Sequence, residues 1–325
     1  MKKQQYELEH WVVESIKLNT KKGNLDNISR TLFYESYYRR NHEIKWAFLA
    51  GMVSRNAGWC MMDLALPPFR SLIKEKTRKN LFMAYEASNW LIFSDAWPQL
   101  ALYEASKKFG LPLFHLLEKF GISSFMQEEW QRFWQSGDKE RLMTALIINE
   151  QHLIQKPVVK NIVFKKTVFG TLLFRMQDMM HFSTVLFPAL DGRIFGFTAY
   201  DFKRLEERIS LGKRLAWLLF HEEYHLLFSA FSKKAVPTGS RYDYEKFSGK
   251  IHHKNTPILR AVYPIITHNI GSSQRDWYRG QRLEHFFPSP AVPDAYEVSG
   301  WYEKKQNQLL GMALLKEYFY SQHKK

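Results

Sequence analysis

Apolar residues recur every three to four positions along most of the first half of the chain, which is the spacing of one face of an α-helix. Asn, Asp, Gly and Pro residues interrupt this pattern and supply helix caps and stops. The pattern therefore predicts a series of helices. Their expected bounds are 6–18, a second helix that follows the caps at 24–26 and ends near 40, 43–64, 70–93, 95–109, 112–120, 123–135 and 139–155.

The second half is less regular. Segment 158–187 alternates in part but ends in a helix-like run, so both a strand and a helix remain open there. We expect a short β-hairpin near 186–199, a long helix from about 200 to 231 and a final helix near 303–321. Prolines and Gly-Ser pairs between 237 and 300 predict loops. The expected fold is all-α, a single large multi-helical domain in which 1–236 form a helical body. Residues 237–325 form a loop-rich wrapping segment and a C-terminal helix, packed on the same domain.

Composition favours a globular protein of a reducing compartment. The 325 residues are 45% hydrophobic and 16% aromatic, which is ample for a large core. Cys60 is the single cysteine, so no disulfide forms within the chain, and its apolar neighbours should raise its pKa. No apolar run reaches the roughly 18 to 20 residues of a membrane span, and the N-terminus lacks the pattern of a signal peptide. We therefore expect a soluble cytoplasmic protein with no membrane span.

The chain is basic, with a formal net charge of +15. Such a charge favours polyanions, so nucleic acid and an acidic partner are both candidate partners. The charge is spread over segments 70–79, 156–166, 241–254 and 275–282 rather than gathered in one arm. Dispersed charge is more typical of a solubilising surface than of a recognition stripe. A nucleic-acid-associated basic protein is thus one hypothesis among three.

The string His-Glu-Glu-Tyr-His at 221–225 is the most chemically specific in the chain. On a helix, His221 and His225 would share one face and could bind zinc, with Glu222 as the general base. A third protein ligand is needed, and the candidates downstream are Glu245, His252, His253 and His268, none of which has a recognisable spacing. The alternative is a solvated helix face that holds two histidines. A zinc-dependent hydrolase is the second hypothesis.

Polar residues embedded in otherwise apolar helices form the main candidate site. Buried charges and amides must be paired, so we expect these side chains to converge between helices. We expect Arg55 to lie near Asp63, eight residues further along the same helix, in a polar pocket that binds a small anion, a metal or a nucleotide. Arg55 would anchor an anion, and the carboxylates would act as ligands or acid/base groups. A network that only locks the helices together is the alternative. The candidate ligand-binding residues are Arg55, Asn56, Asp63, Glu86, Asn89, Asp95, Asn149 and Glu150, together with Arg241 from the string Thr238-Gly239-Ser240-Arg241, whose small residues and arginine suit a phosphate or carboxylate.

Several of these strings also carry a resemblance. The chain resembles the YppC-like family of spore-forming Gram-positive bacteria, a family of unknown function, over roughly residues 25 to 250. The resemblance implies a bacterial cytoplasmic protein and carries no activity across. In the family pattern a histidine precedes the Thr-Gly-Ser-Arg string, where this chain has Pro237, and the 221–225 string lies outside the pattern. The strings that match are 54–59 with 63–64, 89–93 with 95 and 98–100, 146–151 and 238–241.

The first hypothesis for function is therefore a binding or accessory protein with a polar site between helices and an unknown small ligand. The cofactor is left open, and zinc is considered at the 221–225 string. The sequence leaves open whether the protein is an enzyme.

Overall fold

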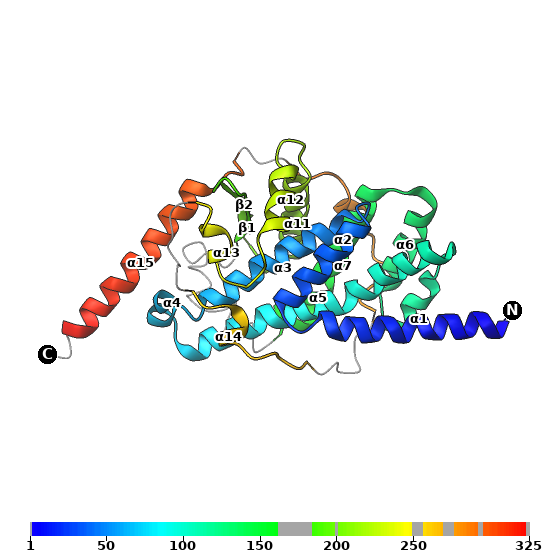
Figure 1. The fold of residues 1–325 in the computed structure, drawn as a ribbon, viewed down its shortest axis with the longest axis horizontal. Coiled ribbons are helices and arrows are strands. Elements are labelled where there is room, and N and C mark those ends of the chain that lie inside the picture. Colours follow the sequence, from blue (N-terminus) through cyan, green and yellow to red (C-terminus); the bar gives the residue numbers. More distant parts are fainter. Residues whose placement is uncertain are drawn as a thin grey trace.

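The computed structural model describes residues 2–161, 184–198, 201–248, 256–268, 276–291 and 295–322. It confirms the predicted fold class, because helices dominate and the described strands form a single hairpin (Figure 1). The elements up to residue 159 are α1 (Lys2–Gly23), α2 (Asn27–Arg40), α3 (Lys45–Asp63), α4 (Pro67–Leu72), α5 (Glu75–Phe109), the 3-10 helix η1 (Phe114–Phe120), α6 (Ser124–Ser136), α7 (Lys139–Ile154) and the π-helical turn η2 (Gln155–Val159).

The later elements begin with the hairpin, in which β1 (Thr184–Pro188) pairs antiparallel with β2 (Ile194–Thr198) and Leu186 lies opposite Gly196. The hairpin lies within the range that the sequence predicted. Of the ambiguous segment 158–187, residues 162–183 lie outside the described part of the chain. The remaining elements are α11 (Leu205–Leu219), α12 (His225–Lys234), α13 (Tyr242–Glu245), α14 (Leu259–Val262), the 3-10 turn η4 (Glu284–Phe286) and α15 (Ser299–Gln322).

Local signals explain where several helices begin and end. The side chains of Asp26, Ser123 and Asp138 accept hydrogen bonds from backbone amides three residues later, so each caps the start of its helix. Gly110 ends α5 in the left-handed conformation, with φ at 68°, which a residue without a Cβ adopts at little cost. These caps account for the agreement between predicted and observed bounds at α2, α6 and α7.

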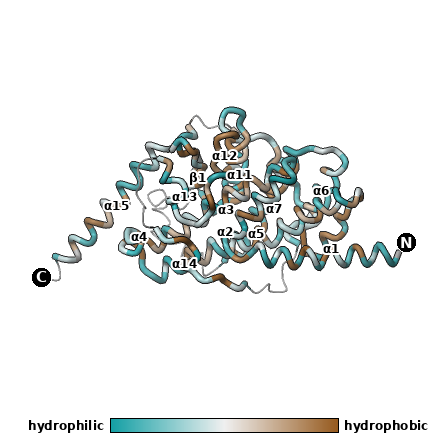
Figure 2. The backbone as a smooth tube through the Cα atoms, in the orientation of Figure 1, coloured by the Kyte–Doolittle hydropathy of each residue, from teal (hydrophilic) through white to brown (hydrophobic). Residues whose placement is uncertain are grey.

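Helix α3 lies at the centre of the packing. It contacts α2, α5, α7, α11, α14 and strand β1. Trp46 and Trp59, both at most 1% exposed, anchor it in the main hydrophobic core. Figure 2 shows hydrophobic residues gathered toward the middle of the molecule, where α3 runs. Side chains from this helix can therefore reach most of the other elements.

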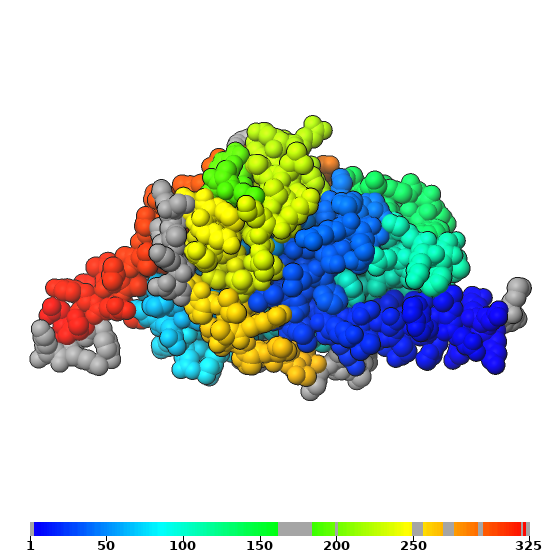
Figure 3. All heavy atoms as spheres, in the orientation of Figure 1, coloured from blue at the N-terminus to red at the C-terminus, as the bar shows by residue number. Residues whose placement is uncertain are grey.

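The chain ends lie at opposite ends of the long axis. Helix α1 extends past the body at one end and α15 at the other, and Figure 3 shows α15 projecting from the body surface. The outer half of α15 exposes Leu314, Leu315, Tyr318 and Phe319. Segments around α13 and α14 lie across the body between these ends (Figure 3). Among the described residues, no helix is both long and apolar enough to cross a membrane.

Two predicted helix boundaries were wrong. The expected helices 70–93 and 95–109 are one helix, α5, which continues through Asp95 and Pro98. The side chain of Asn24 donates to the Trp90 carbonyl and to Ser94 Oγ, in the two turns that precede this proline. Conversely, the single helix expected from 200 to 231 is two, α11 and α12, with a break at the His-Glu-Glu-Tyr-His string.

Candidate functional site

The embedded polar residues are mostly buried, but they pair with several different partners. Arg55 is 2% exposed, and its Nη2 lies 2.6 Å from Glu35 Oε1, while Nη1 donates to the carbonyl of Ala235. The expected contact between Arg55 and Asp63 was wrong. Eight residues of helix separate their Cα atoms by about 12 Å, so a carboxylate on the neighbouring helix α2 is nearer. Arg55 therefore ties α3 to α2 and to the end of α12.

Asp63 binds Arg241 instead. The Nε of Arg241 lies 2.9 Å from both carboxylate oxygens, and its Nη2 lies 2.7 Å from Oδ2. In the same string, the amide and hydroxyl of Thr238 donate to the Asp243 carboxylate. The Arg241 guanidinium and the Thr238 amide and hydroxyl were the groups expected to bind an anion. They are already hydrogen-bonded to carboxylates of the protein itself. The string joins the later segments to α3.

Glu86 forms a third buried pair. Both of its oxygens accept hydrogen bonds from Arg30 on α2, and His268 Nε2 lies 3.3 Å from Oε1. Burial raises the pKa of Glu86, but the hydrogen bonds from Arg30 and His268 outweigh it and hold that pKa below its ordinary value. The carboxylate is therefore ionised and fully engaged.

Asp95 and Asn149 meet as expected, without a cationic partner among the described residues. The Oδ2 of Asp95 accepts from Asn149 at 2.6 Å and from Gln99 at 2.6 Å. The amide oxygen of Asn149 in turn accepts from Ser123 and Trp277. Burial raises the pKa of Asp95 to about 7 against these hydrogen bonds. This hydrogen-bond network joins α5, α6 and α7. The side-chain amides of Asn149 and Gln99 take part in hydrogen bonds within it.

The His-Glu-Glu-Tyr-His string lies in the break between α11 and α12, and its two histidine rings lie against different neighbours. The ring of His221 packs on Trp217 and the ring of His225 on Phe220. The ring Nδ1 of His225 lies 3.0 Å from the Leu219 carbonyl, and the Glu223 amide donates to His221 Nδ1. These side-chain contacts replace the backbone bond that a continuous helix would form between residues 219 and 223. The helical geometry on which the zinc hypothesis rests was therefore wrong.

No third zinc ligand accompanies the string in the described part of the chain. Glu245 is buried against the hydroxyl of Tyr302, and His268 lies beside Glu86. His252 and His253 lie outside the described residues. Within those residues, no group of three or more histidine, cysteine, aspartate or glutamate side chains could hold a metal ion. Glu222, the proposed base, is exposed.

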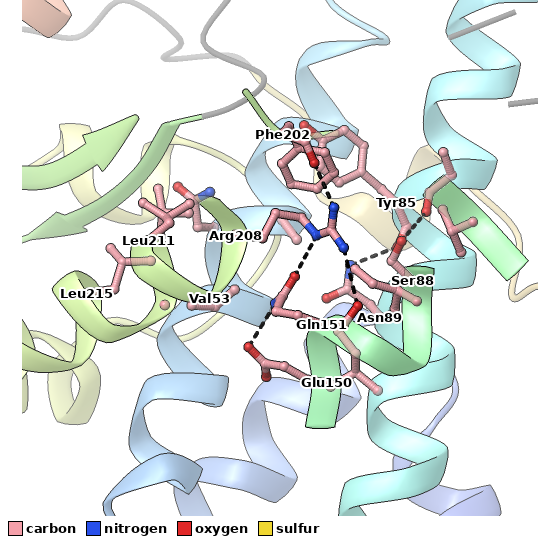
Figure 4. A pocket seen from close by; sticks show the side chains of 18 of the residues that line it. Val53, Tyr85, Ser88, Asn89, Glu150, Gln151, Phe202, Arg208, Leu211 and Leu215 are labelled. Atoms are coloured by element: carbon pink, nitrogen blue, oxygen red, sulfur yellow. Dashed lines mark hydrogen bonds between the residues drawn. The ribbon is translucent and has the colours of Figure 1, made fainter. Parts of the chain in front are cut away.

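The remaining candidates line a cavity of about 190 Å³ between α3, α5, α7, α11 and β1. Its walls are largely apolar. Leu211 and Leu215 of α11 lie on one side, and Tyr85, Ser88 and Asn89 of α5 lie on the other (Figure 4). The main apolar lining residues are Leu49, Val53, Leu81, Ile92, Ile154, Val185, Leu211 and Leu215. Asn56 also reaches the cavity, and its amide bonds to the backbone of β1 at Thr184 and Leu186.

A row of three polar side chains crosses the cavity wall. Arg208 Nε donates to Gln151 Oε1 at 2.9 Å, and Gln151 Nε2 donates to Glu150 Oε1 at 3.0 Å (Figure 4). Burial raises the pKa of Glu150 to about 7, while Gln151 and Trp46 act in the opposite direction. Burial also lowers the pKa of Arg208 to about 10. Gln151 thus separates a half-buried carboxyl from a buried cation.

Sequence reasoning missed Arg208 and assigned no role to Gln151 or Ser88. A signal for Arg208 was present, because Leu205, Arg208, Ile209 and Gly212 follow the i, i+3, i+4, i+7 spacing of an apolar stripe. An arginine on that stripe must be buried. Asn89 and Glu150 do reach this cavity, whereas Arg55, Asp63, Glu86, Asp95, Asn149 and Arg241 pair elsewhere.

The elements above define a helical protein with a largely apolar pocket of about 190 Å³ between its helices. The chain belongs to the family described as "Protein of unknown function (DUF2515)", whose model matches residues 22–303. It is 48% identical over 298 residues to the uncharacterized protein YppC of Bacillus subtilis (strain 168), which covers 92% of this chain and 93% of that protein. The comparison with solved structures found no match. The resemblance that the sequence strings indicated is confirmed.

Proposed function

We propose that this protein is a binding protein that takes a small, mostly apolar molecule into the cavity between α3, α5, α7 and α11. The observation that carries the proposal is the cavity itself, which is apolar over most of its wall and has the carboxyl of Glu150 at its edge. Small-molecule sites typically combine apolar walls with a few placed polar groups. An engineered apolar cavity of about 150 Å³ binds benzene, so about 190 Å³ suits a ring or a short branched chain.

Binding of small neutral probes tests the proposal. We expect toluene and indole to bind saturably in calorimetric titrations and to raise the thermal midpoint. Val53→Phe and, separately, Leu211→Phe should abolish binding, because each fills the cavity with a ring. Val262→Phe is the matched control, since Val262 is 38% exposed on α14 and away from the cavity. A folded wild-type protein that binds neither probe at millimolar concentration rejects the proposal.

A further inference from the structure

The polar wall of the cavity is rich in acceptors. On α5, the hydroxyl of Ser88 donates to the Ala84 carbonyl, and the amide nitrogen of Asn89 donates to the Tyr85 carbonyl. The hydroxyl and amide oxygens of these two side chains are then left to accept hydrogen bonds. On α7, Glu150 adds a carboxyl that accepts a hydrogen bond from the Gln151 amide. Asn89 and Gln151 each keep one further N–H, but the side chains at this wall offer more oxygen acceptors than N–H donors.

The cation of the cavity is not available to a ligand. A guanidinium has five N–H groups. In Arg208, Nε donates to Gln151 Oε1, and Nη1 donates to the carbonyls of Phe202 and Lys203. Its Nη2 donates to the Gln151 carbonyl and to Gln155 Oε1. An anionic ligand would find these donors occupied and would lie near the Glu150 carboxyl. The geometry therefore disfavours an anion.

Glu150, which is half-buried, also differs from the fully buried carboxylates. Glu35, Asp63 and Glu86 each lie within 3 Å of an arginine nitrogen. Asp95 lacks a cation but is closed off by two amides and does not line the cavity. Of these carboxyl groups, only Glu150 both reaches the cavity and has no cationic partner within the part of the chain that the structure describes. A ligand that supplied the counter-charge would complete the site.

We infer that the ligand carries a protonated amine on its apolar body, and that the ammonium group binds Glu150 with the Asn89 and Ser88 oxygens close by. This inference rests on the proposed binding function and specifies the ligand class for the same cavity. An ammonium group has three donors and no acceptor, which complements an acceptor-rich wall. The apolar part would contact Leu211, Leu215 and Val53 on the other walls.

Three probes of similar shape and different charge test the inference on the full-length protein. Benzylamine is cationic, benzyl alcohol is neutral and benzoate is anionic. At about pH 8, where Glu150 is ionised, we expect benzylamine to bind at least about tenfold more tightly than benzyl alcohol, and benzoate not to bind. Below about pH 7, benzylamine affinity should fall about tenfold per pH unit, because protons then compete for Glu150. Benzyl alcohol affinity should stay constant.

The groups that face Glu150 do not confuse this pH profile. Arg208, which acts through Gln151, keeps its charge because its pKa is about 10, and the pKa of Tyr34 on α2 lies well above 10. Asp95 titrates in the same range, so Asp95→Asn serves to show that it leaves the profile unchanged.

A matched pair of variants assigns the effect to one carboxyl. Glu150→Gln should lose the preference for the amine and its pH dependence, yet keep the binding of benzyl alcohol. Glu140→Gln, on the exposed start of the same helix, should behave as wild type. Benzyl alcohol binding as tightly as benzylamine at every pH overturns the amine inference while the binding function stands. Failure of all three probes to bind overturns both.

Discussion

Arg241 encloses the carboxylate of Asp63 with three hydrogen bonds of 2.7 to 2.9 Å, although 178 residues separate them in the chain. Neither side chain is more than 5% exposed. The pair fastens the segment after α12 onto the last turn of α3. The hydroxyl of Tyr244, which accepts from Arg241 Nη1, continues the network to Tyr302 on α15. One ion pair thus links the first quarter of the chain to its C-terminal helix.

Removing Asp63 should be costly. We expect Asp63→Ala to lower the free energy of unfolding by about 3 to 5 kcal/mol, because it leaves the Arg241 guanidinium buried without its counter-charge. Urea unfolding at neutral pH measures the change. Asp191→Ala, which breaks an exposed pair with Arg193, should cost no more than about 1 kcal/mol. An equal cost for the two variants would contradict the assignment. The apolar double replacement Asp63→Leu with Arg241→Met should be more stable than Asp63→Ala.

Stability should depend on pH through Asp95. Its folded-state pKa of about 7 lies above the ordinary value of 3.8, so the folded state binds more protons than the unfolded state between these values. The contribution is therefore fully present below about pH 4 and is lost as the pH rises through about 7. We expect Asp95→Asn to flatten the fall in unfolding free energy over this range. Glu150→Gln should remove a separate part of this fall in unfolding free energy, because Glu150 titrates in the same pH range. If the pH dependence of the unfolding free energy is unchanged in Asp95→Asn, folding does not raise the pKa of Asp95.

The His-Glu-Glu-Tyr-His string should not bind zinc. We expect protein purified after zinc supplementation to carry no stoichiometric metal by elemental analysis, because the two histidine rings lie against different neighbours and no third ligand accompanies them among the described residues. His225→Ala should leave the metal content unchanged and cost about 1 kcal/mol, from the lost contact with the Leu219 carbonyl. Stoichiometric zinc that this variant removes would restore the hydrolase hypothesis.

The net charge of +15 should give weak, non-specific binding to nucleic acid. We expect duplex DNA to bind at about 50 mM salt and to be released by about 200 mM, since affinity from phosphate contacts falls steeply as counterions compete. Fluorescence anisotropy with two unrelated duplexes measures this. Absence of binding at the lower salt concentration would remove the nucleic-acid hypothesis, and a sequence preference at the higher one would contradict non-specific binding.

The sequence predicted much of the secondary structure because local signals decide it. Caps at Asp26, Ser123 and Asp138 set helix starts, and the apolar periodicity set the buried faces. It failed at two places. Pro98 does not end α5, and Asn24, from a distant part of the chain, hydrogen-bonds to the two turns before it. At the 221–225 string the cause is local, because the side chains of His221 and His225 take backbone hydrogen bonds that a continuous helix would use.

In the candidate site, likewise, the sequence predicted which polar residues are buried but not which residues they bind. Apolar surroundings correctly marked Arg55, Asp63 and Glu86 as buried groups that need partners. Their partners, Glu35, Arg241 and Arg30, come from other elements, and periodicity within one helix says nothing about which elements meet. The cavity was beyond reach for the same reason, since its walls come from α3, α5, α7, α11 and β1.

Gly212 sets how closely α11 approaches α7 at the cavity. A Cβ at this position would lie 2.7 Å from Cγ2 of Ile147, so even alanine would require the Ile147 side chain or one of the two helices to shift. The absence of a side chain at Gly212 therefore contributes to the width of the cavity on this wall. Among relatives, we expect a larger residue at this position to accompany a smaller one at position 147, and a change at one of the two alone to alter the size of molecule accepted. The size of the residue at position 212 would then determine which ligands related proteins accept, while the polar groups that bind the ligand stay the same.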